Sequence, residues 1–187
     1  MKALSNFGVV VLAVVVTFGR QVPRDSFAGE QSSAAANPEM ERLAKALTGN
    51  WDTVENMARS QFFPDGGSRQ GTVQARLASG GYALVYEVHS NGSAGKLEGF
   101  HTIWWDKNAK LYYFFACFNN PDSLCRMRGS AHWEGDSLVN DYEFMLNGKK
   151  VPCRDTFTFT PTSHTLLAAM DTGDGMRTMI TTRATKR

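Results

Sequence analysis

The chain begins its ordered pattern with one short amphipathic segment. Apolar side chains recur at the spacing of one helix face, at Met40, Leu43, Ala44 and Leu47. Asn37-Pro38 is typical of a helix start, because asparagine caps the first turn and proline fits the first helical position. Gly49 follows and ends the segment. The pattern predicts a helix over 38–47. So short a helix is not stable alone in water, so we expect it to lie against a barrel end or wall.

From Trp51 onward, apolar and polar residues alternate with the period of two that is typical of strands. Ten strands are predicted, over 51–59, 72–77, 82–89, 97–105, 110–118, 124–133, 137–146, 149–160, 165–172 and 176–183. The connections between them are short, which indicates an antiparallel up-and-down meander. Closure removes the exposed edges of such a sheet. The predicted fold class is therefore an all-β, up-and-down antiparallel β-barrel of about ten strands with a short N-terminal helix.

Two short turns predict the register of their hairpins. Asn147-Gly148 is a strong signal for a tight two-residue turn, and Asp174-Gly175 is another. The first turn sets Asp141 opposite Arg154, and a cross-strand ion pair favours that register. The predicted pairs are 141–154, 142–153 and 144–151 in the first hairpin, and Met170–Met179 and Ala169–Ile180 in the second.

The strand Leu111–Phe118 is apolar on both faces, unlike its neighbours. A barrel strand with one face in water alternates instead. We therefore expect its outer face to be covered, either by the helix over 38–47 or by a second subunit in a homodimer. The alternative is a partly exposed apolar strand.

The first residues are typical of an export signal. Met1-Lys2 is basic, and the apolar run Phe7–Phe18 is shorter than the roughly 20 residues that span a bilayer. We expect a signal peptide over 1–28 with cleavage after residue 28 or 36, a linker over 29–37 and a barrel domain over 38–187. The protein is then secreted or periplasmic, with no membrane span after signal removal. The alternative is an uncleaved anchor.

Charge and motifs exclude several classes of function. The net charge is +2, from 20 Lys and Arg against 18 Asp and Glu, and no basic block stands out. Nucleic-acid binding therefore has no electrostatic support. Phosphate-loop, dinucleotide-binding and zinc-protease motifs do not occur in the sequence.

The three cysteines, at 117, 125 and 153, suggest one disulfide and one leftover thiol in an exported protein. Cys117 and Cys125 lie symmetrically about Pro121, which would set them opposite each other across a hairpin. We predict that they form the pair. The alternative is three buried thiols. Cys153 has no assigned base and is weak evidence for a nucleophile.

Gly49-Asn50-Trp51 on the first strand, ten short strands and a basic residue near the end of the last strand resemble the calycin superfamily. Within it, segments 98–106 and 110–112 are similar to an uncharacterised bacterial lipocalin-like family related to nitrobindin. The resemblance covers residues 43–187. It implies that Trp51 packs at the barrel base beneath an arginine of the last strand, for which Arg183 is the best match, in a structural cation–π pair.

The resemblance also raises the question of haem. Nitrobindin-type barrels bind haem through a histidine on the closing strands, whereas residues 176–187 contain none. His164 precedes the predicted ninth strand, beside a turn, where it would be a poor ligand. We therefore predict no cofactor and no metal.

A closed barrel has an interior, so we predict that it binds a small apolar or amphipathic molecule. Candidate ligand-binding residues are His101, Trp105, Tyr113, Arg128, His132 and Glu143. If Arg128 and His132 face inward, the cavity is basic and suits an anion. We favour the outward orientation, because apolar residues usually fill a barrel.

Two other functions stay open. One is an enzyme whose interior histidine and carboxylates act in acid–base chemistry, drawn from Glu55, His101, Asp141 and Glu143. Convergence of His101, Arg128 and Glu143 would favour it. The other is a secreted interaction scaffold with a filled core. We assign no catalytic residue and lean away from an enzyme.

Overall fold

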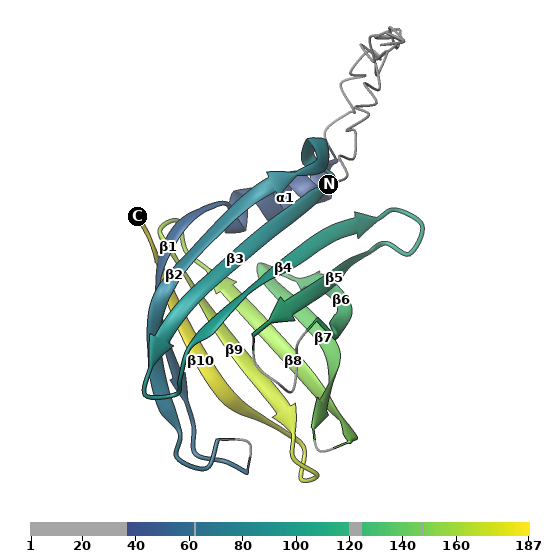
Figure 1. Ribbon diagram of the computed structural model, residues 1–187. Coiled ribbons are helices and arrows are strands. Elements are labelled where there is room, and N and C mark those ends of the chain that lie inside the picture. The colour runs from purple at the N-terminus through teal and green to yellow at the C-terminus, as the bar shows by residue number, and fades with distance from the viewer. Residues whose placement is uncertain (1–36, 62, 120–124, 147) are drawn as a thin grey trace, which may run out of the picture. The chain divides into compact units, whose positions relative to one another are not determined.

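The computed structural model describes residues 37–61, 63–119, 125–146 and 148–187. The predicted signal peptide, its cleavage sites and nearly all of the linker lie outside the described residues. Ten antiparallel strands form a closed barrel in which each strand pairs with its neighbours in the chain and β1 pairs with β10 (Figure 1). The predicted fold class is therefore confirmed.

The elements follow the predicted order, with one additional 3₁₀ turn. They are α1 (Pro38–Leu47), β1 (Gly49–Met57), β2 (Gly67–Ala78), η1 (Ser79–Gly81), β3 (Ala83–Gly92), β4 (Leu97–Asp106), β5 (Leu111–Phe118), β6 (Met127–Glu134), β7 (Ser137–Leu146), β8 (Lys149–Phe159), β9 (Ser163–Asp171) and β10 (Met176–Lys186). No helix among the described residues is long and apolar enough to cross a membrane.

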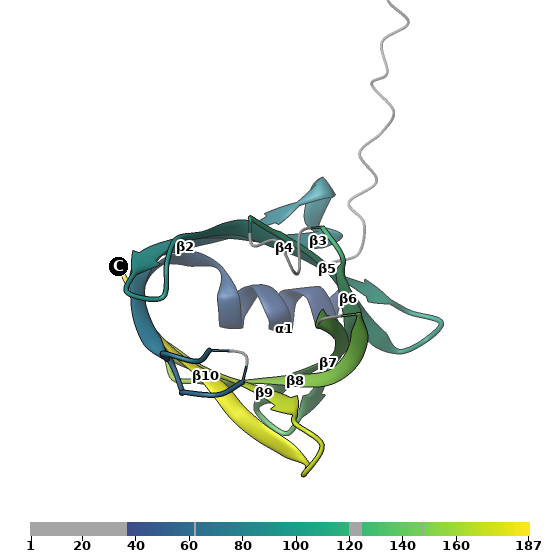
Figure 2. The ribbon, with the colours of Figure 1, turned by 60° about the horizontal axis from the view of Figure 1, so that its bottom comes forward.

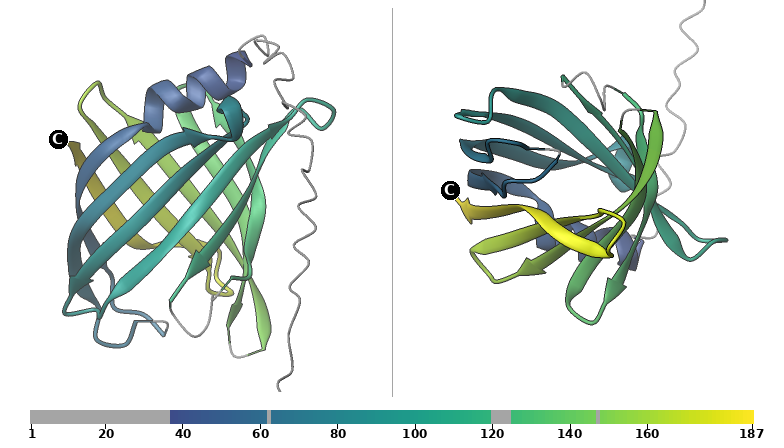
Figure 3. Two further views of the ribbon diagram at one scale, coloured as in Figure 1. Left: turned by 45° about the horizontal axis from the view of Figure 1, so that its top comes forward. Right: turned by 90° about the horizontal axis from the view of Figure 1, so that it is seen from below.

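Helix α1 lies across one end of the barrel (Figures 2 and 3). Its cap is the predicted one, since the Asn37 side chain accepts a hydrogen bond from the Glu39 backbone N–H at 3.0 Å. Its apolar face, formed by Met40, Leu43 and Leu47, is buried. The expectation that the helix rests on the barrel is confirmed, and its place is the end rather than the wall.

Two hydrogen bonds fix α1 directly to the strands, and a third extends this network to β6. The indole N–H of Trp51 donates to the Leu47 carbonyl at 2.9 Å, which ties the last helical turn to β1. The Tyr112 hydroxyl lies 2.8 Å from the Glu39 carbonyl oxygen, and it accepts from the Trp133 indole N–H at 3.0 Å. Because these bonds join α1 to β1, β5 and β6, the helix acts as a fixed floor of the barrel.

The half of the barrel next to α1 is filled by apolar side chains. Leu43, Leu84 and Tyr112 are completely buried there, and Trp51 and Ile103 are 2% exposed. They belong to one cluster that includes the buried face of α1 and inward residues of most strands. This half supplies the hydrophobic stabilisation of the fold.

The register predicted from Asn147-Gly148 is confirmed. Asp141 pairs with Arg154, and the pairs 142–153 and 144–151 also form. The Arg154 Nε donates to an Asp141 carboxylate oxygen at 2.7 Å on the outer face of the sheet.

The register predicted from Asp174-Gly175 is wrong. Met170 pairs with Arg177 rather than with Met179, and a bulge at Met179 then sets Ile180 opposite Ala168. The connection is a four-residue loop, over 172–175, in which the Asp171 carboxylate accepts from the Gly173 backbone N–H at 2.8 Å. This side-chain turn lengthens the loop, and the bulge places both Met179 and Ile180 against the interior cluster.

The expectation that α1 covers the outer face of β5 is also wrong, because the helix lies across the barrel end. Tyr113 on that face is 36% exposed. Phe115 is half-buried, with the Phe100 ring at 6.1 Å and the Arg128 guanidinium 5.6 Å from its centroid. Within the chain, this strand matches the partly exposed alternative.

Candidate ligand-binding cavity

The half of the barrel away from α1 contains a cavity of about 350 Å³. This volume lies within the range of small-molecule sites, roughly 300–1,000 Å³. Most of its lining is apolar and comes from strand positions remote from the helix, among them Met57, Val88, Phe118, Met127, Phe144 and Met170. A small set of polar side chains shares the interior, and these decide what chemistry the cavity offers.

One polar group is the ion pair between Glu55 on β1 and Arg69 on β2. The two residues are cross-strand partners, and the Arg69 Nε donates to a Glu55 carboxylate oxygen at 2.6 Å. The Thr182 hydroxyl lies 3.4 Å from the other Glu55 oxygen. The side chains of Arg69 and Glu55 are only 10% and 14% exposed. The charge of Arg69 is therefore already neutralised within the cavity wall.

A second polar group centres on Asp155 of β8. Its side chain faces inward between Cys153 and Phe157, and the residue is 5% exposed. It accepts a hydrogen bond from the Tyr142 hydroxyl at 3.1 Å. No Lys, Arg or His of the described residues forms an ion pair with it. Burial raises the pKa of Asp155 to about 7, because the interior disfavours the ionised form.

Asn140 lies directly across the strand pair from Asp155, on β7. It is completely buried, and neither its amide nitrogen nor its amide oxygen has a hydrogen-bond partner among the described residues. Small side chains flank the two polar ones, Ala131 beside Asn140 and Ala168 beside Asp155. A buried amide with no partner is costly. Asn140 itself does not line the cavity, whereas its neighbour Asp155 does.

His101 is the one predicted ligand-binding residue that lines this cavity. Its ring lies 5.2 Å from the Phe118 ring and 6.0 Å from the Phe114 and Tyr86 rings, measured between centroids. Burial lowers the pKa of His101 to about 4, so the imidazole is neutral at pH 7. It can therefore contribute a hydrogen-bonding group but no charge.

His164 lies within β9 rather than before it, which corrects the predicted strand start. The ring packs 4.6 Å from Trp51 and 6.0 Å from Phe157 and Phe159, and its Nε2 is 3.4 Å from the Tyr86 hydroxyl. Because this ring is enclosed among aromatic side chains and does not line the cavity, it does not fit the role of a haem ligand.

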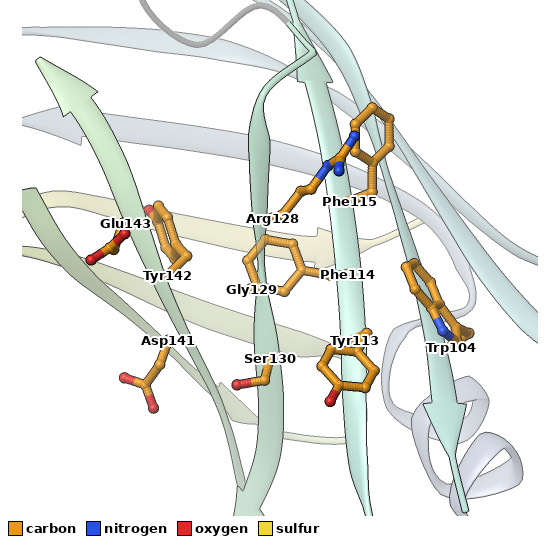
Figure 4. A pocket seen from close by; sticks show the side chains of 10 residues that line it. All are labelled: Trp104, Tyr113, Phe114, Phe115, Arg128, Gly129, Ser130, Asp141, Tyr142 and Glu143. Atoms are coloured by element: carbon orange, nitrogen blue, oxygen red, sulfur yellow. The ribbon is translucent and has the colours of Figure 1, made fainter. Parts of the chain in front are cut away.

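Three other candidates, Tyr113, Arg128 and Glu143, lie on the outer wall of the barrel (Figure 4). They border an open groove of about 900 Å³ over β4 to β7, in which Arg128 extends across the Phe115 ring. Glu143 is paired with Lys150 at 2.6 Å. The structure therefore separates these three residues from His101.

The remaining candidates also lie apart from the cavity. His132 is on the outer face, with its Nε2 3.0 Å from a Glu134 carboxylate oxygen. Trp105 faces inward but packs on the filled half, 4.9 Å from the Tyr112 ring. Arg128 and His132 thus point outward, as favoured, and the basic-cavity alternative fails.

The convergence that would favour an enzyme does not occur. Glu55 and His101 line the cavity, whereas Asp141 and Glu143 border the outer groove. Arg128 and Glu143 are separated from His101 by the barrel wall. The acid–base set proposed from sequence is therefore divided between two surfaces.

The predicted pair of Trp51 and Arg183 is wrong. Arg183 is exposed and pairs with Val54, whereas the cross-strand partner of Trp51 is Lys186. The Lys186 Nζ lies 5.5 Å from the Trp51 ring centroid. Residues 183 and 186 are three apart, so they point to opposite faces of a strand, and only Lys186 is in register with the tryptophan.

The cysteines are divided into one pair and one single thiol. Cys117 and Cys125 are joined by a disulfide, and Cys153 is free and buried. Burial raises the pKa of Cys153 to about 12, and its Sγ lies 3.4 Å from the Val151 carbonyl. Cys153 is therefore a protonated core side chain at neutral pH rather than a nucleophile.

Sequence reasoning missed Asp155, Asn140 and Arg69, of which Asp155 carried the clearest signal. Asp155 shares a strand face with Cys153 and Phe157, so a carboxylate interrupts a run of otherwise apolar inward positions. A polar residue on an apolar face is the pattern that marks a buried functional group.

No group of three or more His, Cys, Asp or Glu side chains in the described part of the chain is arranged to hold a metal ion. Comparison of the sequence with models of known protein families and with curated proteins finds no match, so the interpretation of the site depends on its geometry and chemistry.

Proposed function

We propose that this barrel binds a small amphipathic molecule in the cavity opposite α1. The observation that carries the proposal is a cavity of about 350 Å³ in which a mostly apolar lining surrounds a few buried polar groups, among them Asp155 and Ser90, whose hydroxyl has no hydrogen-bond partner among the described residues. Protein interiors are normally packed without such voids. A cavity that combines apolar walls with a few convergent polar groups is the usual form of a ligand site.

We also propose that the protein is exported and that it is related to calycin-type barrels. Export to an oxidising compartment is supported by the apolar run Phe7–Phe18 and by the Cys117–Cys125 disulfide, a bond that persists mainly outside the cytosol. A relationship to calycin-type barrels is supported by the closed ten-stranded meander and the buried Trp51 on β1.

Native mass spectrometry of the protein isolated from its own host tests the binding proposal. Two leucine substitutions on β9 make a matched pair. Ala168→Leu fills the cavity beside Asp155, whereas Ala169→Leu adds the same bulk on the outer face. We expect a bound small molecule in the wild type and in Ala169→Leu, and its loss in Ala168→Leu. A mass without adduct in repeated wild-type preparations, or equal retention in both variants, would overturn the proposal.

A further inference from the structure

Among the described residues that line the cavity, Lys96 pairs with Glu98, and Asp155 is the acidic or basic side chain without an ion-pair partner. Glu55 and Arg69 neutralise each other on one side of the barrel. On the other side, Asp155 is 5% exposed and its only hydrogen-bond partner among the described residues is the neutral Tyr142 hydroxyl. The carboxylate form of Asp155 therefore lacks a cation. Buried charges in proteins are normally paired, so a ligand is the natural source of the missing partner.

The groups around Asp155 match the donors of an ammonium ion. The Asp155 carboxylate lines the cavity and offers two acceptor oxygens. The Tyr142 hydroxyl oxygen is a further acceptor next to the carboxylate. An ammonium group has three N–H donors and no acceptor.

We propose that the cavity binds an amphipathic primary amine, with its protonated amino group held by Asp155 and Tyr142 and its apolar part against the cavity lining. This inference rests on the proposed function, since it names the chemical class of the ligand. Aromatic rings of Tyr142 and Phe157 border the same part of the cavity and attract a cation through their faces.

An anionic head group is disfavoured by the same arrangement. Arg69 already pairs with Glu55. His101 carries no charge at pH 7, since burial holds its pKa near 4. A carboxylate ligand would meet no free cation among the described residues within the barrel, and it would repel an ionised Asp155.

Three probes of equal chain length test the head group by isothermal titration calorimetry: octylamine, octan-1-ol and octanoate. Asp155→Asn removes the charge with little change in shape. Asp141→Asn makes the identical change on the outer face, where Asp141 contacts Arg154. We expect octylamine to bind most tightly to the wild type and to Asp141→Asn. In Asp155→Asn its affinity should fall by about thirtyfold or more, the usual effect of removing one partner of a buried charge pair.

Proton linkage gives a second readout that needs no variant. Asp155 has a pKa near 7, so about half of the carboxyl groups must release a proton on binding an ammonium at pH 7. Titrations in two buffers of different ionisation enthalpy measure this release. The affinity for octylamine should rise between pH 5 and pH 8, and this rise should be absent in Asp155→Asn. The titratable and charged groups that line the same cavity are Glu55, Arg69, Tyr86, Lys96, His101 and Tyr142, and Cys153 packs beside Tyr142.

The outcomes distinguish recognition of the amino group from binding in the cavity. Equal affinity for all three probes, or a preference for octanoate, would overturn the amine proposal while leaving cavity binding intact. Failure of every probe to bind the wild type would overturn the amine proposal and count against the proposed function. Melting curves of the two variants check folding, and the proton release of the wild type decides the matter if Asp155→Asn does not fold.

Discussion

The two halves of the barrel are built from the same ten strands but use their inward positions differently. Next to α1, inward side chains such as Leu84 and Tyr112 are completely buried and pack in one apolar cluster. Away from α1, the interior holds a cavity together with Glu55, Arg69 and Asp155. Strand β8 passes through both regions, with Phe159 packed on the filled half and Asp155 beside the cavity. One half therefore stabilises the fold. The other holds buried polar groups with which the proposed ligand would pair.

The largest expected effect comes from the filled half. Leu43→Ala removes a completely buried side chain of α1 and should lower the free energy of unfolding by about 4 kcal/mol, measured by urea denaturation. Lys45→Ala, on the exposed face of the same helix, is the control and should stay within about 0.5 kcal/mol of wild type. Cavity affinity should be unchanged in both. A large loss of affinity in Leu43→Ala would show that the halves are coupled.

In the cavity half, a substitution of Asp155 should instead raise the free energy of unfolding at neutral and alkaline pH. The pKa of Asp155 in the folded protein is about 7, above its ordinary value of 3.8. The unfolded chain therefore loses this proton first, and the wild type loses stability as pH rises from about 4 to about 7. Asp155→Asn does not show this loss of stability, because asparagine does not titrate. Relative to the wild type, the variant should gain about 3 kcal/mol between pH 4.5 and pH 8.

Denaturation of both proteins at the two pH values measures that gain. A stability difference that does not vary with pH would mean that Asp155 has an ordinary pKa, and the contrast between the two halves would then be weaker than the structure indicates.

A smaller effect is expected where the helix is joined to the barrel. Trp51→Phe removes the hydrogen bond to the Leu47 carbonyl and should cost about 1.5 kcal/mol in urea denaturation. Trp104→Phe, at a 39% exposed site on the outer wall, makes the same change away from both interiors and should cost less than about 0.5 kcal/mol. Equal losses of stability in the two variants would contradict a special role of the Trp51–Leu47 hydrogen bond in joining the helix to the barrel.

The smallest effect distinguishes the two basic residues of β10. Arg183→Ala should change the free energy of unfolding by less than about 0.5 kcal/mol, because its side chain is exposed. Lys186→Ala should cost up to about 1 kcal/mol, because its amino group lies over the Trp51 ring. A larger cost for Arg183→Ala, measured by thermal unfolding, would contradict this assignment.

Local patterns in the sequence were sufficient for the helix and for one hairpin. Asn37 caps α1 as predicted, and the Asn147-Gly148 turn sets Asp141 opposite Arg154. The second hairpin was mispredicted, because a side-chain turn at Asp171 and the bulge at Met179 shift the register without a clear local signal.

The site was harder to predict than the fold. Alternation shows which residues share a strand face, but it does not show which face points inward when both carry mixed side chains. On β6 the outward placement of Arg128 was favoured on apolar content alone. The pairing of Trp51 depended on the register of β10, and Asn140 became informative only once its burial and its missing partners were known.

Because α1 lies across one end of the barrel (Figure 3), it also limits how deep the cavity can be. A barrel open at both ends would let a long chain thread through, so its length would matter little. If a straight-chain ligand binds as proposed, the packed face of α1 with Leu43 and Leu47 would block its extension at that end, and the chain would extend toward the other end. Each added methylene should improve binding by up to about 0.8 kcal/mol while it still touches the wall, and by almost nothing once it emerges into water. Across a series of straight-chain ligands, the affinity should therefore rise with chain length and then level off.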